Sequence, residues 1–334
     1  MTLVAEEILA KLDPKTRARV QLATEVDAQK QLTPSIGLNL ALKGGFGFGR
    51  QVLLWGNKSA GKSSFCLQMI GIAQKQGKVC AWIYAEAAYS ADWANSMGVD
   101  SQSLIYSPAK TINDMVDVAV QLMEAGVDII IVDSISALLP AIYFEKDGDE
   151  LKSLQDTKQI GAEAKDMTHA VKMLNYANKN TLLVLISQQR NSFGGMHASH
   201  IPTGGMAVKF FSSTVIKLWS SEAEANAIKS GVKVGDKILE QKVGRPVNWI
   251  IDYNKLGPPN LSGQYDFYYS GSSVGIDGVG ESLDTAEMMG IVQKGGAWYT
   301  IGEERFQGRA KTVEYLRSNP DIVDKLKEQI LAKS

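Results

Sequence analysis

The sequence has few cysteines, and no stretch of it is apolar for long. Its two cysteines, Cys66 and Cys80, are too few for a disulfide framework and lie in apolar segments. We therefore expect buried thiols in a reducing compartment. No apolar run approaches the roughly 18–20 residues of a membrane span. The N-terminal residues lack the pattern of a signal peptide, so we expect a cytoplasmic protein.

Excess charge of either sign is also absent. The chain has 35 lysines and arginines against 36 aspartates and glutamates, for a net charge of −1. Affinity for a polyanion must therefore come from local patches. At 334 residues, with 45% hydrophobic and 21% charged residues, the chain can form one large domain and a smaller one.

Histidine is scarce, yet two of the three histidines, His197 and His200, form an H-x-x-H pair within residues 190–210. A zinc site needs three or four ligands, and neither a cysteine nor a third histidine lies nearby. The same stretch holds four glycines and the isolated Phe193. It therefore favours a mobile binding loop over a metal site.

Short apolar runs alternate with longer helical patterns through the first two thirds of the chain. The runs cover residues 51–56, 79–86, 103–107, 128–134 and 181–189. They are rich in Val, Ile and Leu and do not alternate with polar residues, which is typical of strands covered on both faces. The pattern predicts an α/β fold with a mainly parallel sheet.

The two ends of the chain have a different texture. Helical spacing over residues 3–29, interrupted at Pro14, predicts a small helical segment that docks on another surface. Segments 212–221, 233–244 and 246–255 have strand character and predict an antiparallel extension of the sheet. We expect an N-terminal oligomerisation segment at 1–33, a core at 34–270 and a small α+β C-terminal domain at 271–334.

A phosphate-binding motif stands between the first predicted strand and a predicted helix. "GNKSAGKSS" matches G-x-x-x-x-G-K-[ST] and consists of Gly56, Asn57, Lys58, Ser59, Ala60, Gly61, Lys62, Ser63 and Ser64. The glycines let backbone amides face the phosphates, and Lys62 neutralises the β/γ charge. The Ser63 hydroxyl can bind Mg²⁺. The motif predicts a site for ATP with Mg²⁺.

Three polar residues end predicted strands at the same sheet edge. Asp133 would complete the metal site, or alternatively cap a following helix. We expect Glu86 on a strand beside the one that precedes the phosphate-binding motif. It could polarise the attacking water, or be a solvated strand-end charge. Gln188 could sense the γ-phosphate, or be a simple strand-end amide.

Basic residues gather between residues 152 and 217, where eight of them accompany three acidic ones. Four lysines, Lys158, Lys165, Lys172 and Lys179, recur every seven residues. On a helix they would share nearly one face, drifting about 20° per step. A solvated helix face is the ordinary explanation. The long glycine-rich loop after the next strand favours a functional surface instead.

Several segments resemble one protein family in order and spacing. Besides "GNKSAGKSS" these are "YAEAAYSADWANSMGVD", "IIIVDSISALLP", "LLVLISQQRNSFGG", "TGGMAVKFFSS" and "KGGAWYTIGEERFQGRAKTVEYLRSNP". Together they resemble the bacterial RecA recombinases over residues 35–325. The last segment is the most discriminating, because other P-loop ATPases of this core fold lack it. The divergence between the motifs is typical of a phage- or plasmid-encoded relative.

The resemblance implies roles in the nucleotide site. Glu86 matches the catalytic glutamate, acting with Lys62 and Gln188. Trp93 stands where the family stacks a tyrosine on adenine, and Ser90 replaces an aspartate that contacts the base, which implies relaxed base selectivity. Lys255 matches a lysine that reaches the neighbouring subunit's γ-phosphate. The family has a second such lysine, and Tyr253 stands at its position in this sequence.

The resemblance also implies a DNA interface with two loops, at about 147–160 and 190–209. The implied DNA-binding residues are Ile160, Lys165, Thr168, Lys172, Arg190, Phe193, Gly204, Gly205 and Met206. Lys209 and Phe210 match residues that couple subunits.

Taken together, the sequence predicts an ATP-dependent recombinase. It would form a helical homo-filament on single-stranded DNA, pair it with homologous duplex and exchange strands, with DNA-stimulated hydrolysis. Two alternatives share the core fold: a hexameric helicase or translocase, and a signalling ATPase that binds no DNA. The lysine pattern, the second loop and the C-terminal segment argue against both.

Overall fold

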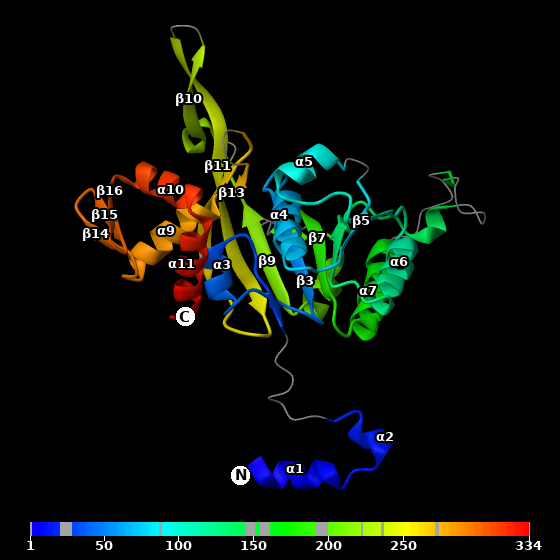
Figure 1. Ribbon diagram of the computed structural model, residues 1–334. Coiled ribbons are helices and arrows are strands. Elements are labelled where there is room, and N and C mark those ends of the chain that lie inside the picture. The colour runs from blue at the N-terminus through cyan, green and yellow to red at the C-terminus, as the bar shows by residue number, and fades with distance from the viewer. Residues whose placement is uncertain are drawn as a thin grey trace.

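The structure is a computed structural model that describes residues 2–20, 29–86, 89–144, 151–153, 161–191, 200–221, 223–234, 237–270 and 274–333. A large twisted sheet forms its centre, and a smaller α+β unit packs against one edge (Figure 1). This arrangement confirms the predicted α/β class.

Six parallel strands form the main part of the sheet. In spatial order they are β5 (Ile105–Pro108), β4 (Cys80–Tyr84), β6 (Ile129–Asp133), β7 (Leu182–Asn191), β3 (Gln51–Gly56) and β9 (Thr214–Trp219). The first five in chain order are those expected from the apolar runs. Their carboxyl ends lie at one edge, where open α/β sheets bind ligands.

The antiparallel extension begins later than the sequence indicates. We expected segment 212–221 within it, but β9 pairs parallel with β3. The reason is the helix α8 (Gly205–Phe211) before β9, which supplies the crossover that parallel pairing requires. Segments 233–244 and 246–255 belong largely to one long strand, β11 (Lys237–Asn254), which pairs antiparallel with β9. The other antiparallel strands are β10 (Ile228–Val234), β12 (Ser262–Tyr268) and β13 (Gly275–Ile276).

Helices cover both faces of the sheet. One face carries α4 (Lys62–Lys75) and α5 (Ala91–Ser96), the other α6 (Ile112–Glu124), α7 (Ala162–Ala177) and α8. Successive residues of β3 enter opposite cores: Leu54 packs in the first and Leu53 in the second, and both are fully buried. This two-sided burial explains the continuous apolar runs.

The remaining elements lie at the ends of the chain or in connections. They are α1 (Thr2–Ala10), α2 (Pro14–Arg17), β1 (Lys30–Gln31), α3 (Ile36–Ala41), β2 (Phe46–Gly47), β8 (His200–Pro202) and the 3-10 turns Ala141–Tyr143 and Glu224–Asn226. The helical pattern is interrupted before Pro14, as predicted, and Asp13 caps α2. None of the α2 side chains is buried, so this segment has no core of its own.

The C-terminal unit has a separate core. It comprises α9 (Gly278–Met288), β14 (Gln293–Gly295), β15 (Trp298–Ile301), β16 (Glu304–Gln307), α10 (Arg309–Ser318) and α11 (Pro320–Ala332). Leu283, Leu316 and Ile330 are fully buried at its centre, and Ile36 of α3 joins the same cluster. The small α+β unit predicted from the sequence therefore packs against α3.

One carboxylate joins this unit to the core. Glu281 of α9 accepts hydrogen bonds from the Ser35 hydroxyl at 2.6 Å and from the amides of Ile36 and Gly37 at 3.0 Å each. These are donors of the first turn of α3, so Glu281 caps a helix distant in sequence. Burial raises the pKa of Glu281 to about 7, and its hydrogen bonds act in the opposite direction.

The elevated pKa predicts a pH-dependent contribution to stability. Because the folded pKa of Glu281 exceeds its ordinary value of 4.5, its contribution is complete below pH 4.5 and is lost as the pH rises through 7. Wild type should therefore lose up to about 3 kcal/mol relative to Glu281→Gln between pH 4.5 and pH 8, measured by urea unfolding. The control is Glu328→Gln, which changes an exposed side chain of α11 in the same unit and is compared with wild type at the same pH values. A difference between wild type and Glu281→Gln that stays constant over this pH range would refute the expectation.

Candidate functional site

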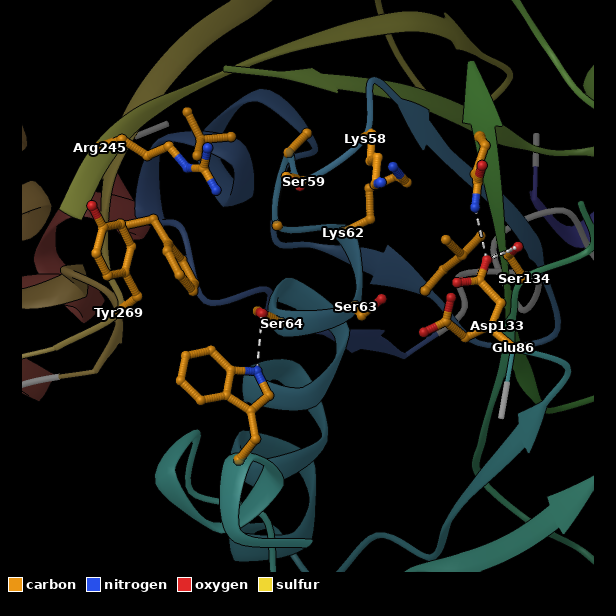
Figure 2. A pocket seen from close by; sticks show the side chains of 17 residues that line it. Lys58, Ser59, Lys62, Ser63, Ser64, Glu86, Asp133, Ser134, Arg245 and Tyr269 are labelled. Carbon is orange, nitrogen blue, oxygen red and sulfur yellow. Dashed lines mark hydrogen bonds between the residues drawn. The ribbon is translucent and has the colours of Figure 1, made fainter. Parts of the chain in front are cut away.

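A cavity of about 400 Å³ opens at the carboxyl ends of the parallel strands (Figure 2). Its lining residues are Lys58, Ser59, Ala60, Gly61, Lys62, Ser63, Ser64, Glu86, Trp93, Asp133, Ser134, Ile186, Gln188, Arg245, Val247, Phe267 and Tyr269. The sequence predicted the first ten of these, from Lys58 to Asp133, together with Gln188, and the structure brings them into one cavity.

The phosphate-binding loop depends on two glycines. Gly56 has φ +156°, and a Cβ there would collide with the backbone carbonyl of Leu218 on β9. Gly61 has φ +80° and precedes the first residue of α4, with open space around it. The loop therefore turns tightly between β3 and α4 and directs the helix N-terminus at the cavity.

Lys62 is held inside this loop. Its Nζ donates to the carbonyl oxygens of Gly56 at 3.3 Å and Asn57 at 2.8 Å. Burial lowers the pKa of the Lys62 amine, while Asp133 and Glu86 act in the opposite direction. The side chain of Asn57 points elsewhere and bonds to the backbone of Ser220.

Asp133 and Ser63 form a compact oxygen pair. Asp133 is the last residue of β6 and is 4% exposed. Burial raises its pKa to about 6, whereas the hydrogen bond with Ser63 and the charge of Lys62 lower it. Residues 134–137 form turns, so the alternative that Asp133 caps a helix is wrong. A carboxylate and a hydroxyl are ligands that Mg²⁺ accepts, so the residues present fit this metal.

Glu86 reaches the cavity from an unexpected strand. We expected its strand beside β3, but β6 and β7 lie between β4 and β3. Glu86 stands two residues beyond the end of β4, and its Oε1 accepts from the Ser134 hydroxyl at 2.5 Å and from Gln188 Nε2 at 2.9 Å. The two strand-end residues, Glu86 and Gln188, therefore act on each other rather than standing alone in solvent.

The opposite end of the cavity is aromatic. Trp93 of α5 donates from Nε1 to the Ser64 hydroxyl at 3.3 Å. Ser90 caps α5 by accepting from the Trp93 amide at 3.3 Å. Figure 2 shows Arg245 and Tyr269 on this side of the loop, away from Asp133 and Glu86.

Sequence reasoning missed the cavity residues of β11 and β12 and the turn after β12. These are Arg245, Val247, Phe267 and Tyr269. An apolar strand pattern cannot show that a hairpin folds back over a loop far away in sequence. Arg245 did leave one signal, since it is the charged member of a row of alternate residues that is otherwise apolar.

The predicted DNA-binding residues gather on α7, α8 and the end of β7. Lys165 and Lys172 are exposed on α7, with Thr168 between them. Gly204, which precedes Gly205 and Met206 on α8, packs against Met167 of α7. Arg190 at the end of β7 lies 3.7 Å from Glu163 at the start of α7.

Parts of this interface lie outside the described residues. Ile160, Phe193, most of the first loop and residues 192–199 of the second fall there, as does Lys158. The four-lysine stripe is wrong for Lys179, because α7 ends at Ala177. Within the described part of α7, Lys165 and Lys172 remain on one face.

A second cluster surrounds the residues predicted to couple subunits. Lys255 Nζ donates to the carbonyl of Phe210 at 2.7 Å, and Lys209 pairs with Asp252 at 2.7 Å. The Phe210 side chain is 63% exposed. None of Lys209, Phe210 and Lys255 lines the cavity of its own chain.

Comparison with known proteins identifies the family. The family model of the RecA N-terminal domain matches residues 14–257, and that of the RecA C-terminal domain matches residues 280–334. The chain belongs to the RecA family. It is thus an ATP-dependent DNA recombinase and a P-loop ATPase that depends on DNA. The match to the C-terminal domain sets aside the helicase and signalling alternatives.

Similar relatives come from several bacteria. Protein RecA of Colwellia psychrerythraea is 33% identical over 322 residues, covering 93% of this chain and 87% of the relative. Protein RecA of Thermus aquaticus is 33% identical over 309 residues, covering 90% and 84%. That of a Nocardioides species is 32% identical over 322 residues, covering 94% and 86%.

Two classes of feature are absent from the described part of the chain. No helix there is long and apolar enough to cross a membrane. No group of three histidine, cysteine or acidic side chains within those ranges could hold a metal.

The two loop glycines predict unequal effects of the same substitution. Gly61→Ala should cost about 1–2 kcal/mol, because only the left-handed conformation is strained. Gly56→Ala should cost about 1–3 kcal/mol more, because its Cβ also displaces the Leu218 carbonyl. Urea unfolding of both variants measures the difference, and equal losses would show that β9 does not constrain the loop.

Proposed function

We propose that ATP with Mg²⁺ binds in this cavity and drives a cycle of filament assembly and release on single-stranded DNA. The loop 56–64 would hold the phosphates, with Lys62 against the β and γ groups. Mg²⁺, held by Ser63 and Asp133, would neutralise charge that develops on the phosphates. Trp93 would stack on the base.

Glu86 would act as the catalytic carboxylate. It lies at the phosphate end of the cavity, beside Asp133 (Figure 2). Its Oε1 receives two hydrogen bonds, which fix the carboxylate and leave Oε2 to orient a water toward the γ-phosphate. The site would thus combine a water-positioning carboxylate, the cationic side chain of Lys62 and a pair of ligands for one Mg²⁺. These are the parts that phosphoryl transfer needs.

The observation that carries the proposal is the hydrogen bond between Gln188 and Glu86. Gln188 sits on the strand that continues to Arg190 and the second DNA loop. The amide and hydroxyl of Thr203, at the other side of that loop, donate to the Gln188 carbonyl at 3.0 and 3.1 Å. A change at the γ-phosphate that moves Gln188 therefore moves both ends of the loop.

DNA would bind across α7 and α8. Lys165, Lys172 and Arg190 would supply positive charge. The backbone amides of Gly204 and Gly205, at the N-terminus of α8, would donate hydrogen bonds to a DNA phosphate. Ile160, Thr168, Phe193 and Met206 complete the proposed interface. Such contacts bind any sequence, and base pairing then provides the recognition of homology.

Assembly would place the nucleotide between subunits. Lys255, Lys209 and the exposed Phe210 stand apart from their own cavity, which suits contact with a neighbour's nucleotide. Residues 1–33 would pack on the adjacent subunit, 34–270 form the ATPase core and 271–334 the C-terminal domain. The free buried cysteines suit a cytoplasmic location.

The function predicts a specific profile for Glu86→Gln. Wild type should hydrolyse ATP faster with single-stranded DNA and exchange strands between homologous oligonucleotides. Glu86→Gln keeps the side-chain shape but loses the carboxylate, so turnover should fall at least about a hundredfold. Binding of Mg·ATP and of single-stranded DNA should stay within about threefold, measured by fluorescence titration.

The matched control is Glu240→Gln on β11, far from the cavity, which should leave turnover unchanged. Turnover of Glu86→Gln within about tenfold of wild type would remove Glu86 from the role. The proposed function itself would be refuted if the wild-type ATPase rate were the same with and without single-stranded DNA and the protein exchanged no strands.

The proposed DNA surface predicts a change in salt dependence. Each of Lys165→Ala and Lys172→Ala should lower the slope of log affinity against log salt by about 0.7, because each removes one phosphate contact. The loss should be similar for all DNA sequences, as measured by anisotropy with poly-dT and mixed oligonucleotides. Lys311→Ala in the C-terminal unit is the control, and an unchanged slope for both α7 variants would place DNA elsewhere.

A further inference from the structure

Arg245 occupies a core-facing position on β11. Side chains alternate along a strand, so Arg245 shares a face with every second residue. The others in this row are buried and apolar: Val243, Val247, Trp249 and Ile251. A guanidinium in such a row is costly unless its donors find acceptors.

The structure leaves one of these donors unsatisfied. The Nε of Arg245 is buried, and within the described ranges it has no hydrogen-bond partner. The side chain lines the nucleotide cavity together with Tyr269. A missing acceptor is therefore expected inside the cavity, from a ligand.

The position of Arg245 indicates which part of a nucleotide it meets. Glu86, Asp133 and Ser63 mark the end where the γ-phosphate and metal would lie. Arg245 and Tyr269 lie on the opposite side of the loop (Figure 2). Trp93, fixed by its bond to Ser64, completes an aromatic lining at that end. The base of a nucleotide fits there.

The hydrogen-bonding groups at this end are mainly donors. The carboxylates and carboxamide of the cavity, those of Glu86, Asp133 and Gln188, belong to the phosphate end. At the base end Arg245 offers only donors, and the Ser64 hydroxyl already accepts from Trp93. Ser90 is engaged as the cap of α5.

Purines differ in what they present to such a site. Guanine and hypoxanthine carry a 6-oxo acceptor beside the N7 acceptor, a pair that one guanidinium can bind. Adenine has a 6-amino donor in place of the oxygen, which Arg245 cannot satisfy.

We propose that Arg245 binds the purine base, and that the cavity therefore takes 6-oxopurine nucleotides at least as well as adenine nucleotides. The proposal rests on the proposed function, because it requires a nucleotide in this cavity. It makes Arg245 a specificity-determining residue of the site.

The test is displacement of a fluorescent ADP analogue by ADP, GDP and IDP from the full-length protein with Mg²⁺. Diphosphates avoid hydrolysis, and IDP carries the 6-oxo group without the 2-amino group of guanine. In wild type, GDP and IDP should bind within threefold of ADP or more tightly. A preference for ADP beyond threefold overturns the proposal.

Arg245→Gln is the decisive variant. A carboxamide accepts from the 6-amino group of adenine and donates to N7, so the preference should move toward ADP by about tenfold. Arg245→Lys keeps the charge without the fork and should move it in the same direction by a smaller factor. An ADP:IDP ratio that stays within threefold of wild type in Arg245→Gln overturns the proposal.

Comparison within each variant separates specificity from folding. A general loss of stability lowers the affinity for all three nucleotides alike and leaves their ratio intact. Lys229→Ala on β10, remote from the cavity, should leave the ratio unchanged. Failure of wild type to bind any of the three would refute the proposed function, whereas binding without a change of ratio refutes the role of Arg245 alone.

Discussion

The functional site depends on the pairing of β3 with β7. In this parallel register Gly56, the first residue of the phosphate-binding loop, lies opposite Gln188. The pairing brings the loop that would hold the phosphates next to the side chain that bonds to Glu86. Both strands are buried on both faces, so neither can slip without moving its side chains into the wrong core. The geometry between loop and amide is therefore set by the core of the protein.

Burial gives this edge of the sheet its chemistry. Asp133 and Lys62 are both largely removed from water. Burial raises the pKa of Asp133 and lowers that of Lys62, and both shifts favour the neutral form of the side chain. Each is only partly compensated by its neighbours. A bound triphosphate with its metal would supply the missing charges, an anion for Lys62 and a cation for Asp133. Such a site favours a ligand that carries both signs close together, as a metal–nucleotide complex does.

The sequence predicted local structure and motifs well, but not how strands lie side by side. The apolar runs correctly located β3, β4, β5, β6 and β7, and the glycine spacing located the loop. It did not show that β9 runs parallel to β3, because direction depends on the crossover through α8. The prediction that β4 lies beside β3 was also wrong, because the order of strands in a sheet follows from tertiary packing. Arg245 was missed for the same reason: the cavity that it lines is formed mainly by elements far away in sequence, including a loop almost two hundred residues earlier.

Helix α8 is where the three proposed activities meet. It begins at Gly205, beside Gly204, which lies close to Met167 of α7, the helix proposed to face DNA, and it carries the exposed Phe210 near its end. Between them, Lys209 lies over the ring of Trp55, the residue before Gly56, at 5.7 Å. One short helix thus lies next to the strand that leads into the phosphate-binding loop, the proposed DNA surface and the proposed surface for the next subunit. A displacement of this helix as a unit would shift all three contacts together, which is how the proposed sites would be coupled.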